Sequence, residues 1–289
     1  MQELHIGEND AGQRFDKYLK KLLAEAPGSF VYKMLRKKNI TLNSKKADGT
    51  EKLSCGDEVK LFLSDETYEK FRAKSKTVMP EAFSGSEKTL RQLKVLYEDA
   101  DILIINKPSG MLSQKARPED VSANEYILSY LLREGALTEE EMRTFRPSVC
   151  NRLDRNTSGI LIAGKTLKGL QEMSKALKER TIQKYYRCVV KGEVLREDYL
   201  KGWLVKDERE NKVTVSTVKP KSADAAPIET AYRPIWTGGG YTGLEVHLIT
   251  GRSHQIRAHL ASIGHPIIGD VKYGDAGTNE QFRDRKSVV

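Results

Sequence analysis

Hydrophobic positions in the N-terminal part of the chain follow two different periods. In RFDKYLKKLLAEA the apolar side chains recur at the spacing of one helix face, and lysines occupy the other face. These apolar side chains are Phe15, Tyr18, Leu19, Leu22 and Leu23. Pro27 and Gly28 end this helix, and Ser29 is expected to cap a second one in SFVYKMLRKK. NITLN and DEVKLFL alternate as strands do, so we expect a small α/β module over residues 1–64.

Residues 65–92 are polar and poor in aliphatic side chains, which predicts a linker. After it, LKVLYED and DILIINKP are expected to pair as strands, and further strand-like segments are GILIAGK, QKYYRCVVKG, KVTVSTV, IETAYRPIW and GLEVHLIT. Helices are expected in SANEYILSYLLREG, TLKGLQEMSKALKER and SHQIRAHLASIG, the last one ended by Gly264 and Pro266. Many strands joined by short turns favour an α+β domain with a mixed, mainly antiparallel sheet over residues 93–289, rather than a wound βαβ fold.

The charge of the chain favours an acidic partner. Lysine and arginine number 49 against 40 aspartate and glutamate, a formal net charge of +9, and nucleic acid is the commonest partner of such proteins. The predicted N-terminal module carries a run of basic residues with no acidic residue between them. The run consists of Lys33, Arg36, Lys37, Lys38, Lys45 and Lys46. It predicts either a surface that contacts RNA phosphates or an ordinary solvated helix face.

Several kinds of chemistry have no signature in the sequence. There is no phosphate-binding glycine-lysine loop and no dinucleotide-binding glycine triplet, and His254 and His259 lie about 140° apart around a helix, unlike a metal-ligand pair. Cys55, Cys150 and Cys188 are too scattered for a disulfide framework. The N-terminus lacks an apolar export core, and no stretch approaches the roughly 20 apolar residues of a membrane span. We therefore expect a cytoplasmic protein without metal, cofactor or membrane contact.

Candidate chemistry begins with the stretch CNRLDRNTSGILIAG, where Asp154 stands between Arg152 and Arg155. Adjacent guanidinium groups favour the ionised carboxylate and keep it available as a nucleophile or base, although an aspartate that only caps the NTSG turn would look the same. In TGRSHQIRAH, Arg252 is expected in a turn and Arg257 one turn into a helix. Arg257 is either a surface residue or the partner of a carboxylate from another segment.

Four segments together resemble one enzyme family. NRLDRNTSGILIAGKT resembles the catalytic His-Arg-Leu-Asp-x-x-Thr-Ser-Gly signature of the RluA family of pseudouridine synthases. YEDADILIINKPSGMLS, KYYRCVVKG and TGRSHQIRAHLASIGHPIIGD match the other blocks of that family in the same order, over residues 93–275. The N-terminal module looks like the small RNA-binding domain that longer members share with a ribosomal protein of the small subunit.

The resemblance implies roles for particular residues. Asp154 falls on the catalytic aspartate of the family, Tyr186 on the tyrosine that stacks on the target base, and Arg257 on the arginine that pairs with the aspartate. Without the resemblance, Tyr186 would be either a strand tyrosine that packs in a core or an aromatic residue that stacks on a base. We assign to substrate binding a further set of residues: Arg152, Arg155, Thr157, Arg252, His254, Gln255 and Lys107.

The resemblance also implies the reaction. We expect a monomeric enzyme that isomerises uridine to pseudouridine in structured RNA, with large-subunit (23S) ribosomal RNA as the first expectation and transfer RNA as the second. The target base must leave its stack to reach the aspartate, so base flipping is expected. Three routes stay open for the aspartate: attack at C1′ of the sugar, attack at C6 of the base, or assistance of a glycal intermediate. Tyr186 is a candidate for moving the C5 proton, although a phenol is a poor base at neutral pH. The alternative is an RNA-binding or ribosome-assembly factor of the same fold with impaired catalysis.

Two positions depart from the family pattern. Asn151 stands where the family usually has histidine, and since asparagine forms hydrogen bonds without ionising, we expect the loop geometry to survive more surely than full activity. Relatives continue past KYGDAGTNEQFRDRK with a histidine-bearing strand, whereas this sequence stops at Val289, which predicts a shortened C-terminus.

Overall fold

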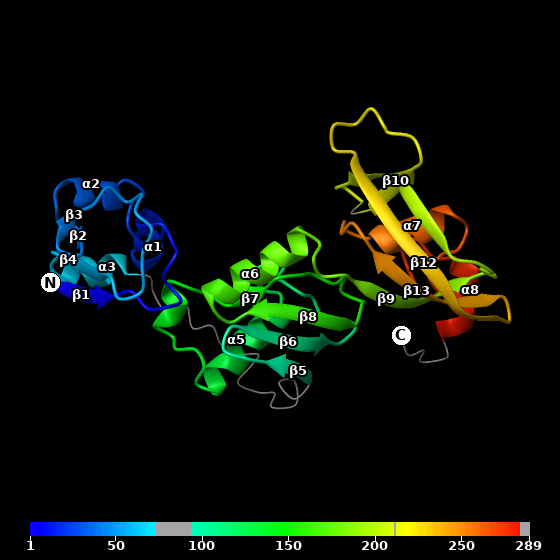
Figure 1. Cartoon of the computed structure of the whole chain (residues 1–289), viewed down its shortest axis with the longest axis horizontal. Coiled ribbons are helices and arrows are strands. Elements are labelled where there is room, and N and C mark those ends of the chain that lie inside the picture. The colour runs from blue at the N-terminus through cyan, green and yellow to red at the C-terminus, as the bar shows by residue number, and fades with distance from the viewer. Residues whose placement is uncertain (73–93, 211, 284–289) are drawn as a thin grey trace. The chain divides into compact units, whose positions relative to one another are not determined.

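The computed structural model describes residues 1–72, 94–210 and 212–283. These residues fall into two compact units, Met1–Leu177 and Lys178–Val289 (Figure 1). The division lies inside the range 93–289 that the sequence assigns to one catalytic domain. The boundaries 1–64, 65–92 and 93–289 therefore stay a prediction.

The N-terminal module is a four-stranded antiparallel sheet covered by helices, in the strand order β1-β4-β2-β3. Its elements are β1 (Gln2–His5), α1 (Phe15–Leu22), α2 (Phe30–Arg36), β2 (Ile40–Leu42), β3 (Lys45–Lys46), β4 (Glu58–Leu61) and α3 (Asp65–Phe71). The apolar face predicted for the first helix is buried in one core with Ile40 and Leu61. Ser29 is the N-cap residue of α2, as predicted, but its side chain makes no capping hydrogen bond.

The prediction of a linker from residue 65 is wrong for its first seven residues, which form helix α3. The Ser64 side chain accepts a hydrogen bond from the Thr67 amide at 3.2 Å and so caps the helix. Tyr68 is buried, and the ring of Phe71 lies 4.7 Å from that of Phe30. Tyr68 and Phe71 thus pack a segment against the module although its composition is otherwise that of a linker. Most of the remaining predicted linker lies outside the described residues.

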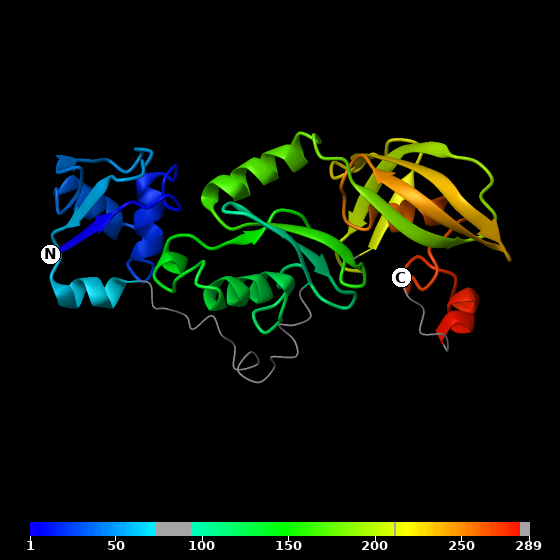
Figure 2. The same cartoon turned by 60° about the horizontal axis from the view of Figure 1, so that its bottom comes forward.

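The rest of the first unit contains a second antiparallel sheet, in the order β5-β6-β8-β7. Its elements are β5 (Lys94–Glu98), β6 (Ile102–Lys107), α5 (Ala123–Arg133), the short 3₁₀ helix η2 (Glu141–Arg143), β7 (Ser148–Val149), β8 (Gly159–Gly164) and α6 (Leu167–Lys178). Leu103, Ile105 and Leu161 pack with Ile127 and Leu131 of α5 in one core. Figure 2 shows this sheet between α5 and α6. The predicted pairing of the first two strands is confirmed.

The second unit is built on a five-stranded antiparallel sheet in the order β11-β10-β12-β13-β9. Its elements are β9 (Tyr185–Lys191), β10 (Asp198–Asp207), β11 (Lys212–Ser216), β12 (Ala226–Gly238), β13 (Tyr241–Leu248), α7 (Gln255–Ser262) and α8 (Ala276–Arg283). Leu260 of α7 packs with Val190, Leu244 and Val246 of the sheet. The predicted α+β class with mainly antiparallel sheets is confirmed. Strand β10 is absent from the prediction, since its charged ends and Gly202 obscure the alternation.

Candidate active site

Asp154 lies half-buried in a loop that precedes β8 and is bound tightly to a second loop. The backbone amide of Thr157 donates to the Asp154 carbonyl at 3.0 Å and closes a turn. The Ser113 hydroxyl donates to the Leu153 carbonyl at 2.8 Å and accepts from the Leu153 amide at 3.0 Å. The loop at 151–157 is thereby fixed to the loop at 107–113.

Arg155 adds a second set of contacts between the same two loops. Its Nε donates to the Gly110 carbonyl at 3.1 Å, and the Gly110 amide donates to the Arg155 carbonyl at 2.8 Å. The Ser109 hydroxyl donates to the Asn156 carbonyl at 2.9 Å. The backbone is therefore held on both sides of Asp154, which fixes the position from which its side chain extends.

Lys107 lies beneath these loops with its side chain fully buried, at 0% exposure. Its Nζ donates to the carbonyls of Pro108 at 3.0 Å, Met111 at 2.7 Å and Arg155 at 3.2 Å. Burial lowers the pKa of Lys107 to about 8, and the charge of Asp154 opposes that change. The sequence assigns Lys107 to substrate binding, and the structure buries its ammonium group against three loop carbonyls. A direct contact of Lys107 with substrate stays a prediction.

Asn151 connects the Asp154 loop to strand β8. Its Nδ2 donates to the Ile160 carbonyl at 3.2 Å, and its Oδ1 accepts from the Ile162 amide at 2.8 Å. One amide side chain thus supplies a donor and an acceptor at once, without a titratable proton. This geometry agrees with the expectation that asparagine preserves the loop.

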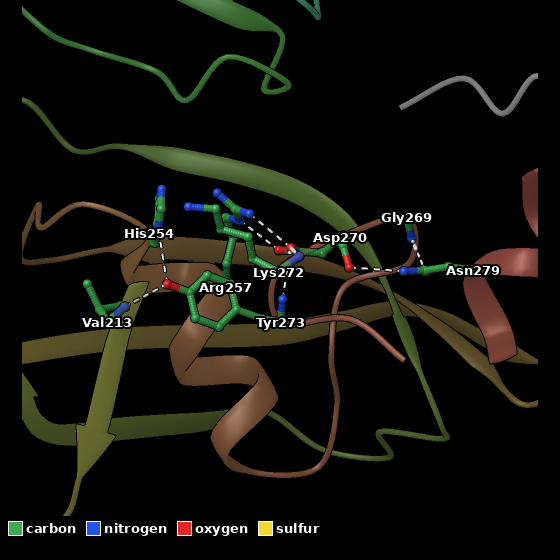
Figure 3. A network of polar contacts seen from close by, with 8 residues as sticks. All are labelled: Val213, His254, Arg257, Gly269, Asp270, Lys272, Tyr273 and Asn279. Atoms are coloured by element: carbon green, nitrogen blue, oxygen red, sulfur yellow. Dashed lines mark hydrogen bonds and ion pairs between the residues drawn. The ribbon is translucent and has the colours of Figure 1, made fainter. Parts of the chain in front are cut away.

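In the second unit, Arg257 on α7 forms a two-pronged ion pair with Asp270 (Figure 3). Its Nε donates to Oδ2 at 2.6 Å and its Nη2 donates to Oδ1 at 2.9 Å. Burial alone would raise the pKa of Asp270, but Arg257 and two backbone amides lower it below the usual value. Asp270 is therefore one partner of Arg257 within its own unit. A pairing with Asp154, which lies in the other unit, stays a prediction.

The other residues of the TGRSHQIRAH segment have distinct surroundings. His254 adopts a left-handed conformation (φ 56°) at the start of α7, and its Nδ1 shares a hydrogen bond of 3.0 Å with the Tyr273 hydroxyl. Gln255 is only 2% exposed and donates to the Glu229 carbonyl and the Thr230 hydroxyl, both at 2.9 Å. Arg252 is exposed. Of the residues predicted here to contact substrate, Gln255 is buried in the fold and Arg252 is exposed, and their contacts with RNA stay predictions.

Tyr186 lies in β9 opposite Val246, half-buried against the core of the second unit. Its neighbour Tyr185 is exposed and its ring stacks on His247 at 4.7 Å. In the first unit Arg152 is exposed and Thr157 is half-buried. The base-stacking role of Tyr186 and the substrate contacts of the other residues stay predictions.

The basic run of the N-terminal module is solvent-exposed at every predicted position, which are Lys33, Arg36, Lys37, Lys38, Lys45 and Lys46. Beside it lies an open hollow of about 370 Å³. The hollow is lined by Lys38, Asn39, Thr41, Ser44, Lys60 and Phe62. Phe62 is 48% exposed, and the buried Thr41 hydroxyl has no hydrogen-bond partner among the described residues. Exposed cations beside an exposed aromatic ring are typical of surfaces that bind RNA.

Comparison with known proteins places this site in a family. A model of the RNA pseudouridylate synthase family matches residues 101–262, a range that contains Asp154, Tyr186 and Arg257. The chain belongs to this family. It is therefore a pseudouridine synthase, an isomerase, and the predicted family and enzyme class are confirmed. Among the described residues, no group of histidine, cysteine and acidic side chains could hold a metal ion, and no helix is long and apolar enough to cross a bilayer.

Relatives resemble this pseudouridine synthase over most of its length. Ribosomal large subunit pseudouridine synthase C of Vibrio vulnificus (strain CMCP6) is 32% identical over 281 residues, which are 95% of this chain and 81% of that protein. The protein of the same name from Escherichia coli (strain K12) is 31% identical over 290 residues, 96% of this chain and 82% of that protein. The solved structure of human RNA pseudouridylate synthase domain containing 4 covers 66% of this chain and 72% of its own, with a TM-score of 0.54 and 21% identity, which shows the shared fold.

Asp270 and Tyr273 are absent from the sequence-based site. Asp270 is the last residue of the quoted block TGRSHQIRAHLASIGHPIIGD, and a carboxylate directly after a glycine turn was the available signal. The sequence does not predict the ion pair between Asp270 and Arg257, because one partner is on a helix and the other is in an irregular segment, and no regular residue spacing relates them.

Proposed function

We propose that this pseudouridine synthase converts uridine to pseudouridine in large-subunit ribosomal RNA, with Asp154 as its nucleophile. The observation that carries the proposal is the loop of Asp154, whose backbone is bound on both sides to the loop at 107–113 above a buried ammonium group. The target is supported by the names of relatives that are 31 to 32% identical. The enzyme acts as a monomer in the cytoplasm, and transfer RNA is the competing substrate.

The reaction needs little beyond a positioned carboxylate. The bond from N1 of the base to C1′ of the sugar breaks, the uracil turns, and C5 bonds to C1′, while the proton on C5 is lost and N1 gains one. No electrons are exchanged with a second reactant, so no redox cofactor is consumed. Asp154 adds to C1′ or to C6, or assists a glycal intermediate, and each route uses the same ionised oxygen.

The remaining residues divide into those that meet RNA and those that support them. Tyr186 stacks on the flipped base, and Arg257 supplies a positive charge beside the reacting groups. Further substrate contacts come from Arg152, Arg155, Thr157, Arg252 and His254. Lys107 and Gln255 act from inside the fold through the backbone that they hold.

Tritium release tests the proposed reaction. Large-subunit ribosomal RNA transcribed with uridine labelled at C5 should lose tritium to water on incubation with the enzyme, while the same RNA labelled at C6 should keep it. A labelled transfer RNA pool run in parallel distinguishes the two substrate classes. Release from transfer RNA alone would overturn the ribosomal target, and release from neither RNA would overturn the proposed activity.

We propose that the exposed basic run of the N-terminal module contacts RNA phosphates. Replacing Lys37, Lys45 and Lys46 with glutamine should weaken binding of ribosomal RNA and reduce the slope of log affinity against log salt by about 2, because each lost phosphate contact removes about 0.7 to 0.9 from it. Filter binding at several salt concentrations measures the slope. The matched control replaces three exposed lysines of the same module outside the run, Lys17, Lys52 and Lys70, with glutamine. An unchanged slope would identify the run as a solvated face.

A further inference from the structure

Arg257 is enclosed on two sides within its own unit (Figure 3). The carboxylate of Asp270 takes the Nε–Nη2 edge of its guanidinium group, and the Asp270 side chain is only 3% exposed. The ring of Tyr273 lies under the guanidinium carbon, with 5.2 Å between that carbon and the ring centre. A carboxylate along one edge and an aromatic ring across one face remove most of the rotamer freedom of an arginine side chain.

The backbone around Asp270 forms a turn that aims the carboxylate. Oδ1 accepts hydrogen bonds from the amides of Lys272 at 2.8 Å and Tyr273 at 3.1 Å. The Gly274 amide donates to the Asp270 carbonyl at 2.9 Å, and a side chain at Gly274 would place its Cβ 2.1 Å from that oxygen. Only glycine fits there, so the turn is specified by the sequence after Asp270 as well as by Asp270 itself.

Two more contacts fix the turn and the ring. Asn279 of α8 donates from Nδ2 to the Asp270 carbonyl at 2.9 Å and accepts the Gly269 amide at 2.7 Å. The Tyr273 hydroxyl accepts the Val213 amide at 2.8 Å, which ties the ring to strand β11. Asp270 and Tyr273, the two residues that contact Arg257, are therefore held by helix α8 and by strand β11, respectively.

We propose that Asp270, with Tyr273 as the second wall, is a positioning residue for pseudouridine formation that acts through Arg257. The proposal rests on the proposed role of Arg257 beside the reacting groups. Because Asp270 holds Nε and Nη2, it fixes the plane of the guanidinium group and the direction in which its other N–H bonds point. Asp270 thereby sets both the place and the direction in which Arg257 meets the reacting carboxylate or the RNA.

Asp270→Asn separates this role from the fold. Asparagine keeps an Oδ1 that accepts the Lys272 and Tyr273 amides, but its amide nitrogen cannot accept the proton of Arg257 Nε. We expect the single-turnover rate to fall about 10- to 100-fold, because a small displacement of a catalytic group has effects of that size, while the RNA dissociation constant changes less than about 3-fold. Glu245→Gln, which removes the charge of a carboxylate whose Oε1 accepts both Nε and Nη2 of Arg233 in the same unit, is the matched control and should keep the wild-type rate.

A double-mutant cycle shows whether Asp270 acts through Arg257. If it does, Asp270→Asn should slow Arg257→Lys by less than about 2-fold, although it slows the wild type about 10-fold or more. Equal effects in both backgrounds would make Asp270 a structural residue and overturn the proposal. If Asp270→Asn does not fold, Tyr273→Leu takes its place in the same cycle, and a folded Tyr273→Leu with the wild-type rate would overturn it too. An inactive wild type would instead overturn the proposed function.

Discussion

Replacing Asp154 with asparagine is expected to lower the single-turnover rate of pseudouridine formation by at least about 1,000-fold, because loss of a nucleophile removes the covalent step itself. Asparagine has nearly the shape of aspartate and can make the same turn, whose observed hydrogen bond uses only the backbone carbonyl of Asp154. The loop at 151–157 should therefore keep its contacts with Ser113 and Gly110. RNA affinity should change by no more than a few-fold.

Tritium release from C5-labelled ribosomal RNA, with filter binding of the same RNA, measures both quantities. Glu119→Gln, which neutralises an exposed carboxylate of the same unit, is the matched control and should leave the rate unchanged. An Asp154→Asn enzyme that kept a tenth of the wild-type rate would remove Asp154 from the nucleophile role. A variant that lost rate and affinity together would show that the carboxylate serves RNA binding instead.

Much of the fold could be predicted because its signals are local. The apolar face of α1 and the strand pair β5–β6 follow from side-chain spacing within single segments, and the structure confirms both. Helix α3 and strand β10 were missed for the opposite reason. Tyr68 of α3 is buried, and Phe71 half-buried, by residues distant in sequence, and β10 gains its register only from its neighbours β11 and β12.

The candidate site could be predicted where its residues are adjacent in the sequence, but not where residues distant in the sequence come into contact. Asp154 attracts attention because arginines flank it in the sequence. The pairing of Arg257 with Asp270 depends on a turn that returns to α7, and no spacing rule encodes it. The sequence assigns Lys107 to substrate binding and does not reveal its burial, since the three carbonyls that surround its ammonium group converge only in the folded loops.

Lys107→Met is expected to destabilise the protein by about 3 kcal/mol and to slow isomerisation by about 100-fold. Methionine fills a similar volume but leaves the carbonyls of Pro108, Met111 and Arg155 without their buried donor. The loop that orients Asp154 then loses its internal support, and misplaced catalytic groups have rate effects of this size. Urea unfolding and tritium release measure the two effects. Lys115 is the control: its Nζ donates to the Pro118 carbonyl at 3.2 Å and lies 4.0 Å from the Glu125 carboxylate, and Lys115→Met should change neither quantity by more than a small fraction.

The pH dependence of stability gives an independent measure of the buried charge. Burial lowers the pKa of Lys107 to about 8 in the folded protein, whereas an unfolded lysine has a pKa near 10.4. Between about pH 8 and pH 10 the unfolded state binds more protons at this group, so its contribution to the free energy of unfolding rises with pH. The stability difference between wild type and Lys107→Met should therefore widen across that window and be smallest below pH 8. A difference that stayed constant would mean that the three carbonyls stabilise the ammonium form enough to cancel the effect of burial on its pKa.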